Sequence, residues 1–119
     1  MYPPPPKETI RQLLESELDT VCYCRYMVHL TFENGSRLSL EGPFRFAQRG
    51  ELSTAPVNEF PLCEPKLTRV LGCKVIEINC DTDGTLDLEF SNGDALIVYA
   101  NDPAYETYTL QIDGKEYVV

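Results

Sequence analysis

The chain has 119 residues, of which 43% are hydrophobic and 24% are charged, which is the size and composition of a single globular domain. Its 19 acidic and 10 basic residues give a formal net charge of −9, which repels the phosphate backbone of nucleic acids. The sequence has no apolar run of the roughly 18–20 residues that a membrane-spanning helix needs. Its first residues lack the charged and apolar regions of a secretory signal. We therefore expect one cytoplasmic domain that binds neither nucleic acid nor membranes.

The predicted elements begin after a proline-rich segment, residues 1–6, which is expected to be a solvated tail. Pro6 can occupy the first turn of a helix, because its missing amide hydrogen is not needed there. Apolar residues then follow at helical spacing: Ile10, Leu13, Leu14 and Leu18. This pattern predicts a helix that opens a first unit, residues 7–45.

Three strands in a meander are predicted to follow this helix. The first strand lies near residues 18–25, and the second is indicated by alternating apolar residues at 28–32. Asn34-Gly35 supplies the positive φ angles of a tight hairpin turn. The alternation resumes at Leu38 and Leu40, which indicates the third strand.

A second unit, residues 63–100, repeats this pattern. Leu14 matches Leu71 at an offset of 57 residues, and Val28 matches Leu86 at an offset of 58. A short helix is predicted from Glu64-Pro65 to Leu71, ended by Gly72. Strands are predicted near 75–81 and at Leu86–Phe90, then, after a turn at Asn92-Gly93, through Leu96 and Val98. We interpret the self-similarity as an internal duplication.

The remaining segments complete the predicted architecture. Residues 46–62 are expected to form a connecting loop, and residues 101–119 a C-terminal hairpin that turns at Asp113-Gly114. The expected fold is mainly β (α+β). Two units of one helix and a three-stranded meander would form a two-sheet sandwich or an open barrel, together with the C-terminal hairpin.

The negative charge is confined to the second part of the chain. Residues 1–74 contain as many acidic as basic side chains, so residues 75–119 account for the whole net charge. Because side chains alternate along a strand, one outer face of the second unit should present most of these carboxylates. The predicted partner-binding residues on this side are Glu77, Asp81, Asp87, Glu89, Ile97 and Tyr99, with Tyr105 and Glu106 from the loop that follows.

Two interpretations of this acidic surface remain open. The carboxylates can simply keep the strands hydrated and prevent strand edges from pairing with other chains. Alternatively, the surface docks a basic protein partner, because like charges on neighbouring strands reduce stability and their retention suggests a use.

The five cysteines are an odd number, so they cannot all pair within the chain, and without an export signal we expect free thiols. Cys22 and Cys24 share one face of a predicted strand, and His29 lies on the next strand. A soft-metal site formed by these three residues is the weaker alternative to ordinary packing, because their spacing matches no standard zinc pattern. We therefore expect no cofactor. The face of the first unit that contains them is expected to be covered by a helix, a loop or another subunit.

Catalytic motifs are missing from the sequence. There is no Gly-x-Ser-x-Gly, no His-Glu-x-x-His and no glycine-rich phosphate-binding loop. His29 is the only histidine, and nothing near it in the sequence would orient it for a catalytic triad. We therefore expect a protein that is not an enzyme.

Several segments resemble a family of small bacterial proteins of unknown function. They are Leu-Glu-Gly-Pro-Phe at 40–44, Leu-Gly at 71–72, Gly-Thr-Leu-Asp-Leu-Glu-Phe-Ser-Asn-Gly at 84–93 and Asp-Pro-Ala-Tyr-Glu-Thr-Tyr-Thr-Leu at 102–110. The family usually has Trp where this chain has Tyr108. The resemblance spans nearly all of the chain and implies a bacterial, cytosolic, β-rich domain without an established activity.

Three functional hypotheses follow from the sequence. The first is a binding protein, in concrete form an immunity-type inhibitor whose acidic face masks a basic site on a toxin. The second is a small-ligand sensor or accessory domain with a pocket between the two units, lined by Tyr105, Glu106 and His29. The third is a structural module that forms a homodimer through the less polar face of the first unit.

Overall fold

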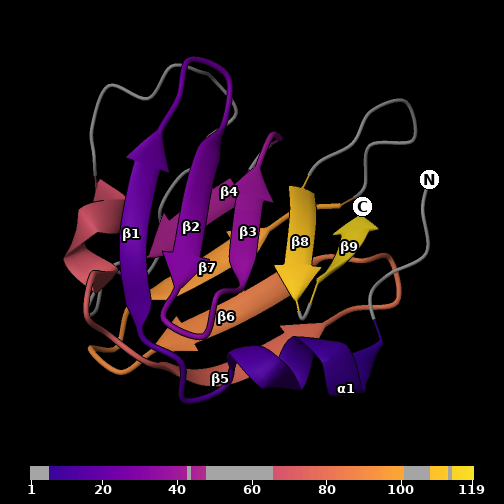
Figure 1. Ribbon diagram of the computed structural model, residues 1–119, viewed down its shortest axis with the longest axis horizontal. Helices are drawn as coiled ribbons and strands as arrows, with labels where there is room; N and C mark the ends of the chain where they lie inside the picture. Colours follow the sequence, from indigo (N-terminus) through magenta and orange to yellow (C-terminus); the bar gives the residue numbers. More distant parts are fainter. Residues whose placement is uncertain (1–5, 43, 48–65, 101–107, 113) are drawn as a thin grey trace.

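The computed structural model describes residues 6–42, 44–47, 66–100, 108–112 and 114–119, and in this part of the chain it is mainly β (Figure 1). The first antiparallel sheet has five strands in the order β1-β2-β3-β8-β9. Their bounds are β1 (Leu18–Tyr23), β2 (Val28–Phe32), β3 (Arg37–Leu40), β8 (Tyr108–Ile112) and β9 (Lys115–Val118).

The second sheet is also antiparallel and has four strands in the order β4-β7-β6-β5. Its strands are β4 (Phe44–Ala47), β5 (Val75–Cys80), β6 (Leu86–Phe90) and β7 (Ala95–Val98). The helical elements are α1 (Lys7–Ile10) and the 3-10 helices η1 (Arg11–Leu13) and η2 (Lys66–Val70).

The two sheets stack in a sandwich-like arrangement, and the described strands form no closed barrel (Figure 1). Alternate residues of both sheets point inward, as the period of two requires, and they meet in one core. Its largest fully buried side chains are Phe32, Phe44, Phe90 and Tyr108, packed among leucines. Tyr108 of the first sheet also donates a hydrogen bond of 2.6 Å from its hydroxyl to the carbonyl of Gly84, in the turn between β5 and β6.

The third strand of each meander pairs with a strand that follows the other meander. β4 comes directly after β3 in the chain but pairs with β7 in the second sheet. In the same way, β8 comes after β7 but pairs with β3 in the first sheet. The chain therefore crosses between the sheets twice, and this exchange joins the two meanders into one core.

The two units make the same hydrogen bonds at equivalent positions. The amide of Leu18 donates to the carbonyl of Cys73 at 3.0 Å, and the amide of Val75 donates to the carbonyl of Ser16 at 3.1 Å. These two bonds are related by the 57-residue offset of the sequence repeat. Both first strands also have their register shift at the same place, after Leu18 in β1 and after Val75 in β5.

The turn before each first strand is equivalent in backbone conformation but not in sequence. Gly72 has φ 79°, and Glu15 is the only non-glycine residue with positive φ in the described part of the chain, at 65°. The Glu15 amide donates to the Val75 carbonyl and the Gly72 amide to the Leu18 carbonyl, both at 2.8 Å. Positive φ is strained for residues other than glycine, so the backbone conformation of Glu15 lowers the stability of the fold, whereas that of Gly72 does not.

The predicted first helix is too long and was wrong beyond Leu13. α1 and η1 end there, because the left-handed backbone at Glu15 stops the helix and Leu18 begins β1. Pro6 precedes α1 as its N-cap instead of occupying its first turn. The second helix is a 3-10 helix that ends at Val70.

Two strand assignments also differ from the sequence analysis. The first strand ends at Tyr23, because the Cys24 amide bonds to the carbonyl of Met27 at 2.8 Å in the turn to β2. β4 was not predicted, and its last two residues fall in the segment 46–62 that was expected to be a loop. The other meander strands lie where the alternation predicted them.

We predict that exchanging the two turn residues has opposite effects on stability. Gly72→Glu should lower the free energy of unfolding by about 1 kcal/mol through backbone strain alone, because no atom lies within 4 Å of an added Cβ. Glu15→Gly should leave the free energy of unfolding equal or higher. Urea denaturation of both variants tests this, and an equal loss in the two would contradict it.

Candidate binding surface on the second sheet

Four carboxylates and one amide lie together on the outer side of β5 and β6 and at the start of the turn that joins them. We call this surface the acidic face, and its residues are Glu77, Asn79, Asp81, Asp87 and Glu89. Glu77 is the register partner of Glu89, and Asn79 is the register partner of Asp87. Glu89 is half-buried and the other four are exposed. The structure thus brings together the four carboxylates that the alternation of the strands placed on one side.

The charges of the acidic face are close enough to influence one another. Partial burial raises the pKa of Asp87, and the neighbouring carboxylates of Asp81 and Glu77 raise it further. Within the described part of the chain, none of these carboxylates has a cation at ion-pair distance. Among the described residues, the face is therefore a source of negative potential that no ion pair offsets.

A less polar strip borders the acidic face along β7. Ile97 pairs with Asp87, Ala95 pairs with Glu89, and Tyr99 follows directly after the strand. Ile97 and Tyr99 are half-buried. On the far side of β7, Arg45 of β4 pairs with Ile97 and marks the end of the surface.

Two predicted binding residues, Tyr105 and Glu106, lie outside the described residues, so the acidic face is defined without them.

The surface is hollowed at two places. A depression of about 110 Å³ is lined by Glu77, Asn79, Asp87 and Glu89. A larger cavity of about 400 Å³ lies where α1 and η1 approach β5, and it is lined by Lys7, Ile10, Arg11, Ile78, Asn79, Cys80, Asp81 and Asp87. Asn79 and Asp87 line both hollows.

The first unit provides an internal comparison for this surface. By the repeat offset, the positions of the acidic face correspond to Thr20, Cys22, Cys24, His29 and Thr31. The pairs Thr20–Thr31 and Cys22–His29 repeat the register of Glu77–Glu89 and Asn79–Asp87. Thr20 and Cys22 are exposed, and the remaining three are half-buried. The same backbone therefore forms with no carboxylate at any of these positions.

Two cysteines of the first unit, Cys22 and Cys24, lie close together. The thiol sulfurs of Cys22 and Cys24 are 3.8 Å apart, and this hydrogen bond raises the pKa of Cys24. His29 pairs with Cys22 in register, while its Nδ1 contacts the hydroxyl of Ser39 at 2.6 Å. Among the described residues, no group of three or more His, Cys, Asp or Glu side chains is arranged to hold a metal ion.

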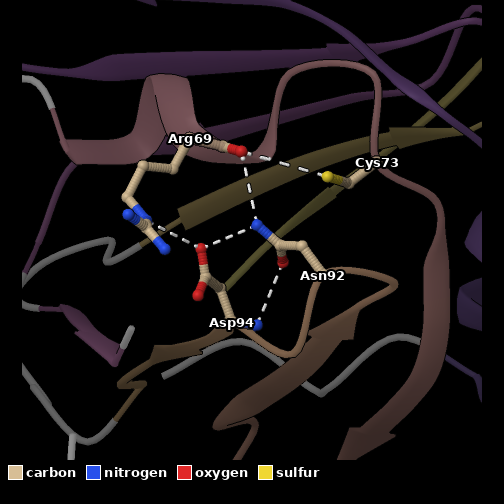
Figure 2. A network of polar contacts seen from close by, with 4 residues as sticks. All are labelled: Arg69, Cys73, Asn92 and Asp94. Carbon is tan, nitrogen blue, oxygen red and sulfur yellow. Dashed lines mark hydrogen bonds and ion pairs between the residues drawn. The ribbon is translucent and has the colours of Figure 1, made fainter. Parts of the chain in front are cut away.

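Sequence reasoning missed a buried polar network beside the β6–β7 turn (Figure 2). Asp94 is fully buried, and its Oδ2 accepts hydrogen bonds from Arg69 Nε at 3.2 Å and from Asn92 Nδ2 at 2.9 Å. Asn92 Nδ2 also donates a hydrogen bond to the backbone carbonyl of Arg69, and the thiol of Cys73 donates to the same carbonyl. Asp94 thus joins the turn to η2 and does not belong to the acidic face.

The sequence offered only a weak signal for this network. The predicted hairpin turn at Asn92-Gly93 is present, and the Asp94 amide donates to Asn92 Oδ1 at 3.0 Å. The equivalent residue in the first unit is Ser36, which is buried in the same type of turn. That difference between the repeats is the one feature that could have indicated a special role for Asp94.

We predict that the contribution of Asp87 to stability depends on pH. Because its pKa is raised in the folded state, ionisation of Asp87 destabilises the fold above that pKa, and the penalty disappears as the pH falls toward the ordinary value of 3.8. Asp87→Asn should therefore be more stable than the unmodified protein at pH 7, and this advantage should shrink as the pH approaches 4.

Urea denaturation at both pH values measures this difference. Glu116→Gln, which removes one exposed carboxylate on β9, is the control for a change in overall charge. An advantage of Asp87→Asn that stays constant or grows between pH 7 and pH 4 would contradict the assignment.

None of the helices in the described part of the chain has both the length and the apolar character to cross a membrane.

Comparison with known proteins confirms the expected family. A model described as "Family of unknown function (DUF6188)" matches residues 10–119, which include all the described strands. No curated protein and no solved structure matches the chain. Because the family model spans nearly the whole sequence, the chain belongs to DUF6188, a family of unknown function.

Proposed function

We propose that this protein is a non-enzymatic binding domain whose acidic face docks on a cationic surface of a partner protein. The observation that carries the proposal is the direct pairing of Glu77 with Glu89 on a face whose counterpart in the other unit pairs Thr20 with Thr31. The proposal includes an origin by internal duplication, after which only the second unit acquired the carboxylates.

The energetics of the sheet favour a use for these charges. Like charges at directly opposed positions of neighbouring strands reduce stability by a few tenths of a kcal/mol to about 1 kcal/mol per pair. A cationic partner removes this repulsion and is attracted over distance, which raises both the rate and the specificity of association. Ile97 and Tyr99, beside the carboxylates, supply apolar area for the contact itself.

A concrete form of this proposal is an immunity-type inhibitor that covers the basic active site of a nuclease toxin. What supports it is the charge of the acidic face, which competes with nucleic acid for a basic groove. The partner to test first is a toxin-like protein encoded by a neighbouring gene.

Variants based on the first unit test the proposal without disturbing the fold. Glu77→Thr/Glu89→Thr places at both positions the residues that the equivalent backbone holds in the first unit. Glu33→Gln/Glu116→Gln is the matched control, because it removes the same charge at exposed sites away from the acidic face. We expect the first variant to weaken binding to the toxin-like protein about tenfold or more, mainly through slower association, and the control to change it little.

Surface plasmon resonance at two salt concentrations measures both rate constants. Equal affinities for the two double variants, or no complex with the toxin-like protein at low salt, would rule out the immunity-type form of the proposal.

A second function, small-ligand binding, is favoured by the larger cavity, which lies between α1–η1 of the first unit and β5–β6 of the second. This is the kind of location that the sequence suggested for a pocket. The lining differs, since His29 does not contribute to it and Tyr105 and Glu106 lie outside the described residues.

A further inference from the structure

The larger cavity lies where the two units differ at an equivalent position. In each unit, the helical segment of the other unit packs against the first strand: η2 against β1, and α1–η1 against β5. At the end of β1, Tyr23 fills this space, and its hydroxyl lies beside the backbone of Leu67 and Thr68 in η2. The equivalent residue at the end of β5 is Cys80, a much smaller side chain that lines the cavity.

The walls of the cavity bear opposite charges. Lys7 and Arg11 come from α1 and η1 on one side; on the other, Asp81 directly follows β5 and Asp87 lies in β6. Within the described residues, neither cation forms an ion pair with either carboxylate. Each wall therefore offers a charge to a molecule placed between them, and a molecule with a single charge would satisfy only one wall.

The rest of the lining is mainly polar. Ile10 and Ile78 lie at its base with exposed fractions of only 2% and 8%, and Asn79 adds an amide with both a donor and an acceptor. Burial raises the pKa of the Cys80 thiol, so this side chain lines the cavity as a neutral group. A volume of about 400 Å³ lies in the range of small-molecule sites.

From these features we propose that the cavity binds a small zwitterion of the amino-acid class. Lys7 and Arg11 hold its carboxylate, and Asp81 and Asp87 hold its ammonium group. The site is separate from the pair Glu77–Glu89, which lines only the smaller depression.

Three probes of similar length separate the contributions of the two walls. L-lysine has both types of charge, 1,5-diaminopentane lacks the carboxylate, and hexanoate lacks the ammonium group. In isothermal titration calorimetry we expect L-lysine to bind and each of the other two to bind about tenfold more weakly or worse, since each loses its charge-assisted hydrogen bonds to one wall. If 1,5-diaminopentane binds as tightly as L-lysine, the role of Lys7 and Arg11 is wrong, and if L-lysine does not bind, the proposal fails.

Variants locate the binding site. Cys80→Tyr introduces the residue that fills the equivalent space in the first unit, so it should abolish L-lysine binding. Arg11→Gln removes one cation of the wall and should weaken L-lysine binding without weakening the binding of 1,5-diaminopentane. Glu77→Thr/Glu89→Thr should bind L-lysine as the unmodified protein does, so a failure of this site is distinguishable from a failure of the acidic face. Unchanged binding in both Cys80→Tyr and Arg11→Gln would overturn the assignment.

Discussion

The structure depends on reciprocal backbone hydrogen bonds where β1 and β5 begin. The amides of Leu18 and Val75 each donate to the chain segment that precedes the other strand, and an isolated antiparallel bridge between Glu17 and Lys74 lies between them. Because these bonds involve only backbone atoms, they survive extensive divergence of the side chains. They hold the first strands of the two units together and thereby fix how the two sheets face each other.

On this shared framework the two units have acquired different chemistry. The outer face of β5 and β6 bears four carboxylates, while the equivalent positions of β1 and β2 bear threonine, cysteine and histidine. At the strand ends, Tyr23 fills a space that Cys80 leaves accessible. The carboxylates and the small side chain of Cys80 both belong to the second unit. The acidic face and the larger cavity also share three residues, Asn79, Asp81 and Asp87.

Most of the meander strands and the acidic face could be predicted from the sequence, because strand alternation and Asn-Gly turns are local signals. β4 was missed because it belongs to no local hairpin and its partner, β7, is far away in the sequence. The first helix was predicted too long because Leu14 and Leu18 fit helical spacing equally well, and nothing in the sequence marks Glu15 as a residue with positive φ. The larger cavity depends on how α1 packs against β5, which is a long-range contact that no local pattern encodes.

The central claim is that the carboxylates of the second sheet are dispensable for folding. It is tested most directly by the free energy of unfolding, at pH 7, of a variant with Glu77→Thr, Asp87→His and Glu89→Thr, the residues found at the equivalent positions of the first unit. The account predicts a cooperative unfolding transition with a free energy equal to or greater than that of the unmodified protein, because like-charge repulsion is removed. A substantial loss of stability would show that the carboxylates support the fold, which would contradict their proposed role as a binding surface.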